Sequence, residues 1–575
     1  MIRRLLPARY RTEFDQFLLL CRGSVSRLLN AALPPRDGDS AQLALWALAL
    51  VATPSAMYGF RQLVNYSSLG FQKAAIIEHA IQVDRMFFLL YGMVVAALVA
   101  AATWEALLPD RADQEIIGTL PVRPRTMAAA RLGASLWLAV VAAAAISVPA
   151  AVFLAVAAPS HSSLGFPPVV LVAHLISTMG ATLFMFILFL ILRAALALCF
   201  GAHTSERLAT GLQVLAIAAL AELFFFIPGV IPLLVKHLSD GDRRVLFIPT
   251  MPYAALYAWL VGLRYPSLGI GAAMAPLALL GAFAIAVPLY LWPARRLARR
   301  ALETQPRQHA GLVSVAARLA ILALPSSPAV RSITSFTVTT MMRSRRHRLI
   351  LAAYLGLALA VGTVSVIAGG LRGTLSFDRP ETSLLALPLV TMFFLTLGLR
   401  TAFAIPSDVD ANWVFRLSQP SVSAAIDAAA MSLIALCVLP VAALAGAAAV
   451  LLGWPMRDAM ILAIFDIACG CALTEWVLGG WRAVPFTCAL SGDVDSLKSR
   501  WLWRVVPLLL FAFVNAAAQK AAFPTDRAAA WYVGAAVGVW SAARVKRRFA
   551  GRDVSVEFDA SPSDSIATLD LSEAL

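Results

Sequence analysis

The hydrophobic and polar residues of this chain alternate in long blocks, and the same layout occurs twice. A basic lead-in precedes about six long apolar runs before residue 295, and a second basic lead-in precedes about six more after residue 330. A hydrocarbon core about 30 Å thick needs roughly 20 apolar residues per helical crossing. The pattern therefore predicts an all-α polytopic membrane protein with about twelve transmembrane helices in two six-helix repeats.

The apolar runs define the expected spans. Several exceed 25 residues, which predicts a tilt or a kink. The spans are 43–60, 86–108, 128–158, 168–200, 208–235 and 267–292 in the first repeat, and 349–369, 384–405, 425–453, 459–481, 505–523 and 528–543 in the second.

Five segments follow from these spans. Residues 1–42 are expected to form a basic amphipathic helix at the membrane interface, although packing against a soluble partner is an alternative. Residues 43–292 and 349–543 are the two repeats, and the similar lead-ins to them suggest an internal duplication that encloses a translocation path. A basic linker, 293–348, contains a short apolar piece at 312–325 that is expected to be interfacial. The acidic tail, 544–575, is expected to be disordered.

Composition and charge support a bilayer environment. Hydrophobic residues make up 60% of the chain and charged residues only 14%, against about 25% charged in soluble domains. The net charge of +15 comes from Lys and Arg scattered among loops, which argues against a nucleic-acid surface.

If the amino-terminus is cytoplasmic, roughly three times as many Lys and Arg fall on the inner as on the outer side, so both termini are expected in the cytoplasm. The basic loop 236–266 departs from this bias, and its part 245–262 is expected to be re-entrant or interfacial.

Two loops of similar layout follow the second span of each repeat. The first reads PDRADQEIIGTLPVRPRTMAAARL and the second FAIPSDVDANWVFRLSQP, and each leads to a proline that is expected to open the next helix, Pro124 or Pro420. Proline fits the first turn of a helix because its missing N–H would be unpaired there.

These loops resemble the intracellular loop of type-2 ABC exporter permeases, in the fused two-repeat form found among bacterial permeases of unassigned substrate. The segment GGWRAVPFTCALSGDVDSLKSR is similar to a later region of the same permeases. The resemblance implies a short helix in each loop that docks on an ATPase, a separate partner subunit, in the bacterial inner membrane. The implied coupling residues are Leu120, Pro121, Arg123, Pro124 and Arg125 in the first loop and Phe415, Arg416, Leu417 and Pro420 in the second. Alternatively, these are membrane-edge loops whose arginines only fix orientation.

The chain has no GxxxxGK[ST] phosphate-binding loop. It is therefore expected to be a transport subunit and not an enzyme, with no cofactor of its own and with ATP bound by the partner subunit. No zinc-ligand spacing occurs, so no metal site is expected. Whether one chain or a homodimer forms the permeation unit is left open by the sequence.

Ionisable residues inside apolar runs are the candidates for a translocation path. Each costs about 2.5–3.5 kcal/mol at the centre of an inserted helix, so its presence points to a role. Asp466 and Glu475 share one predicted helix and are expected to line a polar path or to bind a proton or cation, unless Arg193 or Arg482 pairs with them to fix helix register. A twelve-span secondary transporter driven by such residues is the alternative function. The candidates are Arg193, Glu222, Asp466 and Glu475.

Overall fold

A computed structural model gives the fold of the chain. The residues that it describes are 8–32, 40–69, 74–104, 107–108, 111–157, 167–200, 202–262, 268–303, 327–371, 377, 379–406, 413–487, 507, 510–550 and 556. Within these ranges the regular structure is helical throughout, without a strand, so the all-α prediction is confirmed. The predicted interfacial piece 312–325 and most of the tail 544–575 lie outside the described residues.

The chain divides into two compact units, Met1–Pro306 (unit 1) and Arg307–Leu575 (unit 2). The boundary falls inside the predicted linker 293–348. Each unit is described by itself below.

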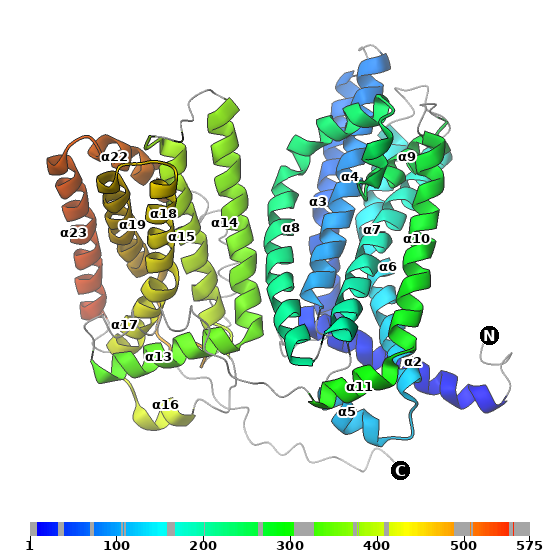
Figure 1. The fold of residues 1–575 in the computed structure, drawn as a ribbon, viewed down its shortest axis with the longest axis horizontal. Helices are drawn as coiled ribbons and strands as arrows, with labels where there is room; N and C mark the ends of the chain where they lie inside the picture. Colours follow the sequence, from blue (N-terminus) through cyan, green and yellow to red (C-terminus); the bar gives the residue numbers. More distant parts are fainter. Residues whose placement is uncertain are drawn as a thin grey trace. The chain divides into compact units, whose positions relative to one another are not determined.

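Unit 1 consists of long helices that run up and down, with shorter helices at both ends (Figure 1). The helices are α2 (Ala8–Ala32), α3 (Ser40–Leu69), α4 (Ala74–Ala102), α5 (Arg111–Ile116), α6 (Pro124–Ala157), α7 (Pro167–Cys199), α8 (Ala202–Ser239), α9 (Met251–Leu260), α10 (Leu268–Leu291) and α11 (Ala294–Glu303), with the 3-10 turns η1 (Ile117–Thr119) and η2 (Arg243–Phe247).

Helix α4 lies at the centre of unit 1, packed against α7 and α8. The prediction of its start at residue 86 was wrong, because the helix begins at Ala74 and carries Asp84 and Arg85 inside it. These charges end the apolar run in the sequence, but buried partners accommodate them in the fold.

The basic loop 236–266 is folded into unit 1. Its helix α9 packs against α7 and α10 and buries Met251, Tyr253 and Tyr257. The loop therefore contributes a short helix to the core, as a re-entrant segment does, instead of lying flat on the surface.

Unit 2 repeats the up-and-down arrangement. Its helices are α13 (Pro328–Arg343), α14 (Arg345–Leu371), α15 (Thr382–Phe403), α16 (Trp413–Ser418), α17 (Val422–Leu433), α18 (Leu439–Leu451), α19 (Met456–Val477), α22 (Asn515–Ala522) and α23 (Asp526–Ala550), with π-helical turns η4 (Ile434–Val438) and η5 (Leu510–Val514).

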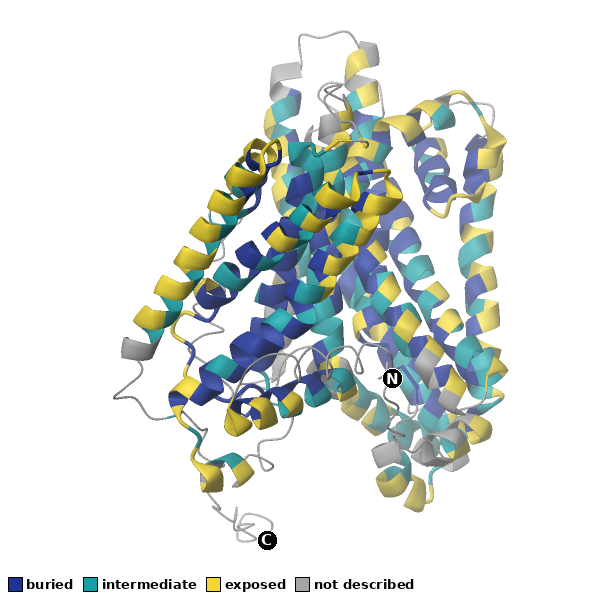
Figure 2. Cartoon of the chain, turned by 60° about the vertical axis from the view of Figure 1, so that its left-hand side comes forward, coloured by how far each residue is buried: buried dark blue, intermediate teal, exposed yellow. Residues whose placement is uncertain are grey.

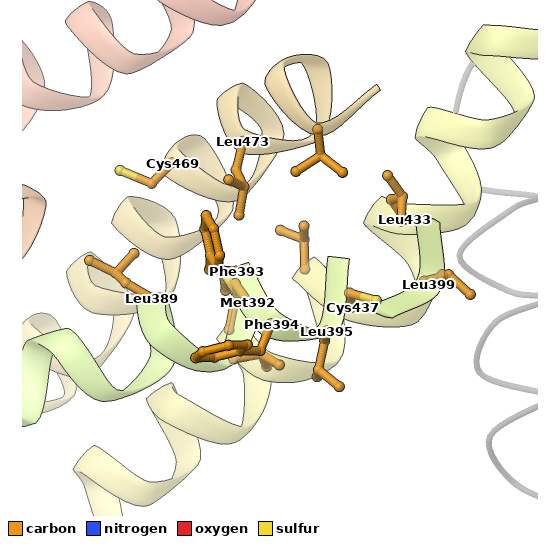
Figure 3. Close-up of a cluster of buried hydrophobic side chains, with 14 of the residues drawn as sticks. Leu389, Met392, Phe393, Phe394, Leu395, Leu399, Leu433, Cys437, Cys469 and Leu473 are labelled. Atoms are coloured by element: carbon orange, nitrogen blue, oxygen red, sulfur yellow. The ribbon is translucent and has the colours of Figure 1, made fainter. Parts of the chain in front are cut away.

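The core of unit 2 forms where α15, α17 and α19 meet. Figure 3 shows Phe393 and Leu399 of α15, Leu433 at the end of α17, Cys437 in η4, and Leu473 of α19 converging in one apolar cluster. Burial of such side chains contributes about 1.5–3 kcal/mol each when the reference is water. In lipid the gain comes from close packing instead.

The third span of unit 2 bends at a π-helical turn. Helices α17 and α18 continue through η4, where the Leu439 N–H donates to the Ile434 carbonyl, five residues back. Pro440 follows immediately and has no N–H to donate, which releases the carbonyl of the preceding turn. Helix kinks commonly occur at such turns and at prolines, and a tilt or kink was predicted for this run from its length.

Nine helices in the described part are long and apolar enough to cross a membrane. They cover nine of the twelve predicted spans. Helices α3 and α23 are also present, over 43–60 and 528–543, and the run 505–523 is described only in part. The buried residues line the helix faces that point into each unit, whereas exposed residues lie on outward faces (Figure 2). Exposed apolar residues such as Trp137, Leu277 and Leu444 suit a lipid-facing surface, and the chain is a polytopic helical membrane protein.

The two units share packing relations as well as helix order. In each, the amphipathic lead-in helix packs on the start of the third span, α2 on α6 and α13 on α17. The second span packs against the fifth (α4 on α8, α15 on α22), and the last span packs against the fourth (α10 on α7, α23 on α19). These parallels support the duplication hypothesis.

Candidate functional site

The first predicted coupling segment is a short helix followed by an exposed turn. Helix α5 and η1 end at Thr119, and α6 begins at Pro124, which occupies the first helical position as predicted. Ile116 and Leu120 are 69% and 54% exposed. The segment thus presents apolar side chains beyond the end of the second span.

An ion pair ties this segment to the amphipathic helix. The Arg123 Nη1 lies 2.6 Å from the Glu13 Oε1 of α2. Both side chains are substantially exposed, so the pair contributes little stability, about 0–1 kcal/mol. Arg125, in the first turn of α6, is exposed. The ion pair of Arg123 thus links the turn before α6 to α2 but adds little to the stability of the fold.

Helix α2 itself is seated closely on α6. The Cys21 thiol donates to the Ala130 carbonyl at 3.3 Å, and burial raises the pKa of that thiol. Gly133 faces Phe17 so closely that an added Cβ would lie 3.3 Å from its ring. Any movement of the first coupling segment is therefore shared by α2 and α6.

The second predicted coupling segment is helix α16. Leu417 is 76% exposed and Val414 is also exposed, whereas the Phe415 ring packs on Phe336 of α13 at 5.0 Å between centroids. Arg416 lies in the helix, but its side chain is outside the described residues. An aromatic contact therefore connects this segment to the lead-in helix of unit 2. In unit 1 the corresponding connection is an ion pair.

Pro420 does not occupy the position predicted for it. The next helix begins at Val422, and its N-cap is Ser421, whose hydroxyl accepts from the Ala424 N–H at 3.3 Å. Gln419 has a φ of 40°, in the left-handed region, so the chain turns sharply before Pro420. A hydroxyl cap thus starts α17, where a proline starts α6.

The predicted path residues of unit 1 lie on neighbouring helices. Arg193 is buried on α7 and interacts electrostatically with Tyr290 of α10. Glu222 is half-buried on α8. Both residues make interactions within the fold, and their assignment to a path stays a prediction.

Asp466 is completely buried among polar groups of unit 2. The Gln519 Nε2 donates to its Oδ1 at 3.5 Å, while its Oδ2 has no hydrogen-bond partner in the described part of the chain. Nearby, the Tyr532 hydroxyl lies 2.8 Å from the Cys469 Sγ and donates to the Asn515 Oδ1 at 3.2 Å. Helices α19, α22 and α23 thus surround one buried carboxylate with neutral polar groups.

Glu475 belongs to a separate ionic cluster near the carboxyl end of α19. Its Oε2 lies 2.9 Å from the Arg547 Nη1, and the Arg547 Nη2 donates to the Asp427 Oδ1 at 2.6 Å. Arg544 approaches Asp427 at 3.6 Å. Arg547 of α23, which was not among the partners considered from the sequence, pairs with Glu475. The cluster joins α17, α19 and α23.

Sequence reasoning missed a third polar cluster, which surrounds Asp84 in unit 1. The hydroxyl of Tyr58 and the amide of Gln62 both donate to Asp84 Oδ1 at 2.8 Å, and the Tyr66 hydroxyl donates to Oδ2. The neighbouring Arg85 is buried as well. The available signal was the Asp-Arg pair directly before the run MFFLLYG, which the predicted span excluded by starting at residue 86.

Comparison with known proteins adds no relative. No protein-family model matches the chain, and no curated protein or solved structure is significantly similar to it.

Proposed function

We propose that this protein is the membrane permease subunit of an ABC exporter, driven by ATP that a separate subunit hydrolyses. The observation that carries the proposal is the short helix between the second and third spans of each unit, with exposed apolar residues beyond the span and a lead-in helix beside it. Exposed leucines at such a loop are unfavourable in water, and a partner protein would cover them.

The contacts around α16 support transmission of movement from such a partner. A force on α16 reaches α17 through the turn at Gln419, and Asp427 on α17 is held by Arg547 of α23. The same arginine holds Glu475 of α19. A displacement of the segment is thereby passed to two further helices of unit 2 and not absorbed locally.

Co-purification tests the proposal. The tagged full-length chain, expressed in its own organism, is expected to retain a subunit with a phosphate-binding loop, and the complex is expected to hydrolyse ATP. Leu417→Glu should lower the amount of the retained subunit about tenfold or more, because the substitution places a charge where the partner would cover a leucine.

Phe247→Glu is the matched control. Phe247 is 84% exposed on η2, shortly before α9. Helix α9 lies at the opposite end of unit 1 from α5 (Figure 1). The substitution of Phe247 should leave the association unchanged. The proposal would be refuted if the Leu417→Glu variant retained as much of the ATPase subunit as the unchanged chain, or if no ATP-hydrolysing subunit were retained at all.

A cation-coupled secondary transporter is the second candidate function. It is favoured by the buried Asp466 Oδ2, which has no hydrogen-bond partner among the described residues. A carboxylate in that state is suited to accept a proton or a small cation. Under this function, cargo uptake into inverted vesicles continues without ATP, stops with a protonophore, and is lost in Asp466→Asn.

A further inference from the structure

The side chain of Arg85 on α4 is buried, and two of its three nitrogens lack a hydrogen-bond partner among the described residues. It is 5% exposed, and its guanidinium lies 3.9 Å above the ring of Tyr257 on α9. Its Nε and Nη2 have no hydrogen-bond partner in the part of the chain that the structure describes. Buried guanidinium donors are normally paired, because an unpaired one forfeits its hydration.

The two unpartnered nitrogens share one edge of the guanidinium. Their N–H bonds are parallel, which is the arrangement that binds the two oxygens of a carboxylate or phosphate at once. The ring of Tyr257 holds the guanidinium plane by a cation–π contact. The donor pair is therefore fixed in orientation before any anion binds.

The adjacent Asp84 is already engaged elsewhere. Its two oxygens accept hydrogen bonds from Tyr58, Gln62 and Tyr66. The negative charge of Asp84 partly neutralises the positive charge of Arg85 at short range. The Asp84 oxygens do not pair with the Nε and Nη2 donors of Arg85.

Two further polar atoms lie near the guanidinium. His174 on α7 and Tyr257 are almost completely buried, with ring centroids 6.3 Å apart, and the His174 Nε2 and the Tyr257 hydroxyl have no hydrogen-bond partner among the described residues. The Phe88 ring meets His174 edge-on at 5.5 Å. Polar donors in an apolar surrounding are typical of a site that binds one polar group of a ligand.

We propose that Arg85, His174 and Tyr257 form a binding site for a single oxyanion group, a carboxylate or phosphate carried by a lipid or by a free solute. Arg85 binds two oxygens through Nε and Nη2, and the Tyr257 hydroxyl and the His174 imidazole donate to the remaining lone pairs. The site is contained in unit 1 and does not depend on the proposed ATP-driven function.

Binding to the purified full-length protein tests the site. The probes are phosphatidylglycerol, followed as mass retained in native mass spectrometry, and sodium phosphate and sodium benzoate, followed as a shift in unfolding temperature. At least one probe should bind saturably. Arg85→Lys keeps the charge but loses the parallel donors, so its affinity should fall about tenfold or more.

Further variants separate binding from folding. Tyr257→Phe keeps the ring and removes only the hydroxyl, and its affinity should fall severalfold. Arg85→Met should abolish binding, and if that variant does not fold, Arg85→Lys and Tyr257→Phe carry the test. Arg61→Gln, at an exposed arginine on the neighbouring helix α3, is the control and should bind as the unchanged chain does.

The two ligand sources give different results. Loss of retained phosphatidylglycerol in the Arg85 variants identifies a lipid, whereas an effect on the salts alone identifies a free solute. Saturable binding that is equal in the Arg85→Lys variant and the unchanged chain, or no binding of any of the three probes, would overturn the proposal.

Discussion

Arg547 holds two buried carboxylates from different helices, Glu475 at 2.9 Å and Asp427 at 2.6 Å. Its side chain is 14% exposed, and that of Glu475 is 2% exposed. Moving such groups out of water costs several kcal/mol per ion, which their attraction only offsets when the pairing is complete. Removing the shared cation is therefore expected to lower the stability of the fold by more than the loss of two ordinary surface ion pairs would.

Arg547→Met is expected to destabilise the protein by about 3–5 kcal/mol, because it leaves the buried Glu475 without its close cation and Asp427 with only the more distant Arg544. The measurement is the unfolding temperature of the detergent-purified protein. Arg544→Met is the matched control: Arg544 is more exposed and lies 3.6 Å from Asp427, so its loss should cost far less. Equal losses of stability in the two variants would show that the buried pairing is not the cause.

The sequence predicted part of these polar clusters. Asp466 and Glu475 stand out because each interrupts an apolar run, and both are buried in unit 2. The partner of Glu475 could not be predicted, since Arg547 lies at the end of the last span, where an arginine is equally expected for orientation. Asp84 and Arg85 were excluded because hydropathy treats adjacent charges as a span boundary. In the fold, hydrogen bonds from α3 hold Asp84, and the Tyr257 ring of α9 lies beneath the Arg85 guanidinium.

Helix α17 begins at a point where the chain changes direction sharply. Gln419 has a left-handed backbone, the ring of Pro420 fixes its own φ, and Ser421 caps the helix. The first N–H groups of a helix lack partners within it, and a serine hydroxyl supplies one. The orientation of α16 relative to α17 therefore depends on this short connection.

Ser421→Ala is expected to cost about 1 kcal/mol through loss of the cap. Hydrogen exchange of the amides at the start of α17, including Ala424, should become faster. Ser418→Ala is the control, because the Ser418 hydroxyl contacts only the Phe415 carbonyl, at 3.5 Å. Unchanged exchange in the Ser421 variant would mean that α17 is held by its packing alone.

The long helices were predicted well because apolar runs of 20 residues or more leave little alternative to a helix. Observed and predicted limits of α7 and α10 differ by a single residue at each end. The π-helical turn η4 was not specifically predictable, since Pro440 fits several kinds of kink. Helix α9 was ambiguous because ten residues can lie on a surface or pack inside, and only its buried tyrosines decide between the two.

The predicted coupling segments of the two units follow the same number of spans. Six of the nine candidate spans lie between Leu120 and Leu417. An even number of crossings returns the chain to its starting side, provided that no crossing occurs in the segments outside the described residues. The topology therefore predicts that both residues face the same compartment.

Cysteine labelling in intact cells tests this arrangement. In a chain whose native cysteines have been replaced, Leu120→Cys and Leu417→Cys should resist a membrane-impermeant maleimide until the cells are opened. Phe247→Cys, between the fifth and sixth predicted spans, should react without opening. Labelling of Leu120→Cys and Leu417→Cys from opposite sides would refute the topology, and with it a shared ATPase.

The close seating of α2 on α6 has a consequence for biogenesis. Helix α2 is synthesised before the first span, but its docking surface, including Gly133 and the Ala130 carbonyl, belongs to the third. The nascent amphipathic helix must therefore remain at the translocon or on the lipid surface until the first two spans and the start of the third have been made. Helix α13 also packs on the third span of its unit, α17, so the docking of a lead-in helix is delayed twice during synthesis. A chaperone that shields nascent amphipathic helices would act at both stages.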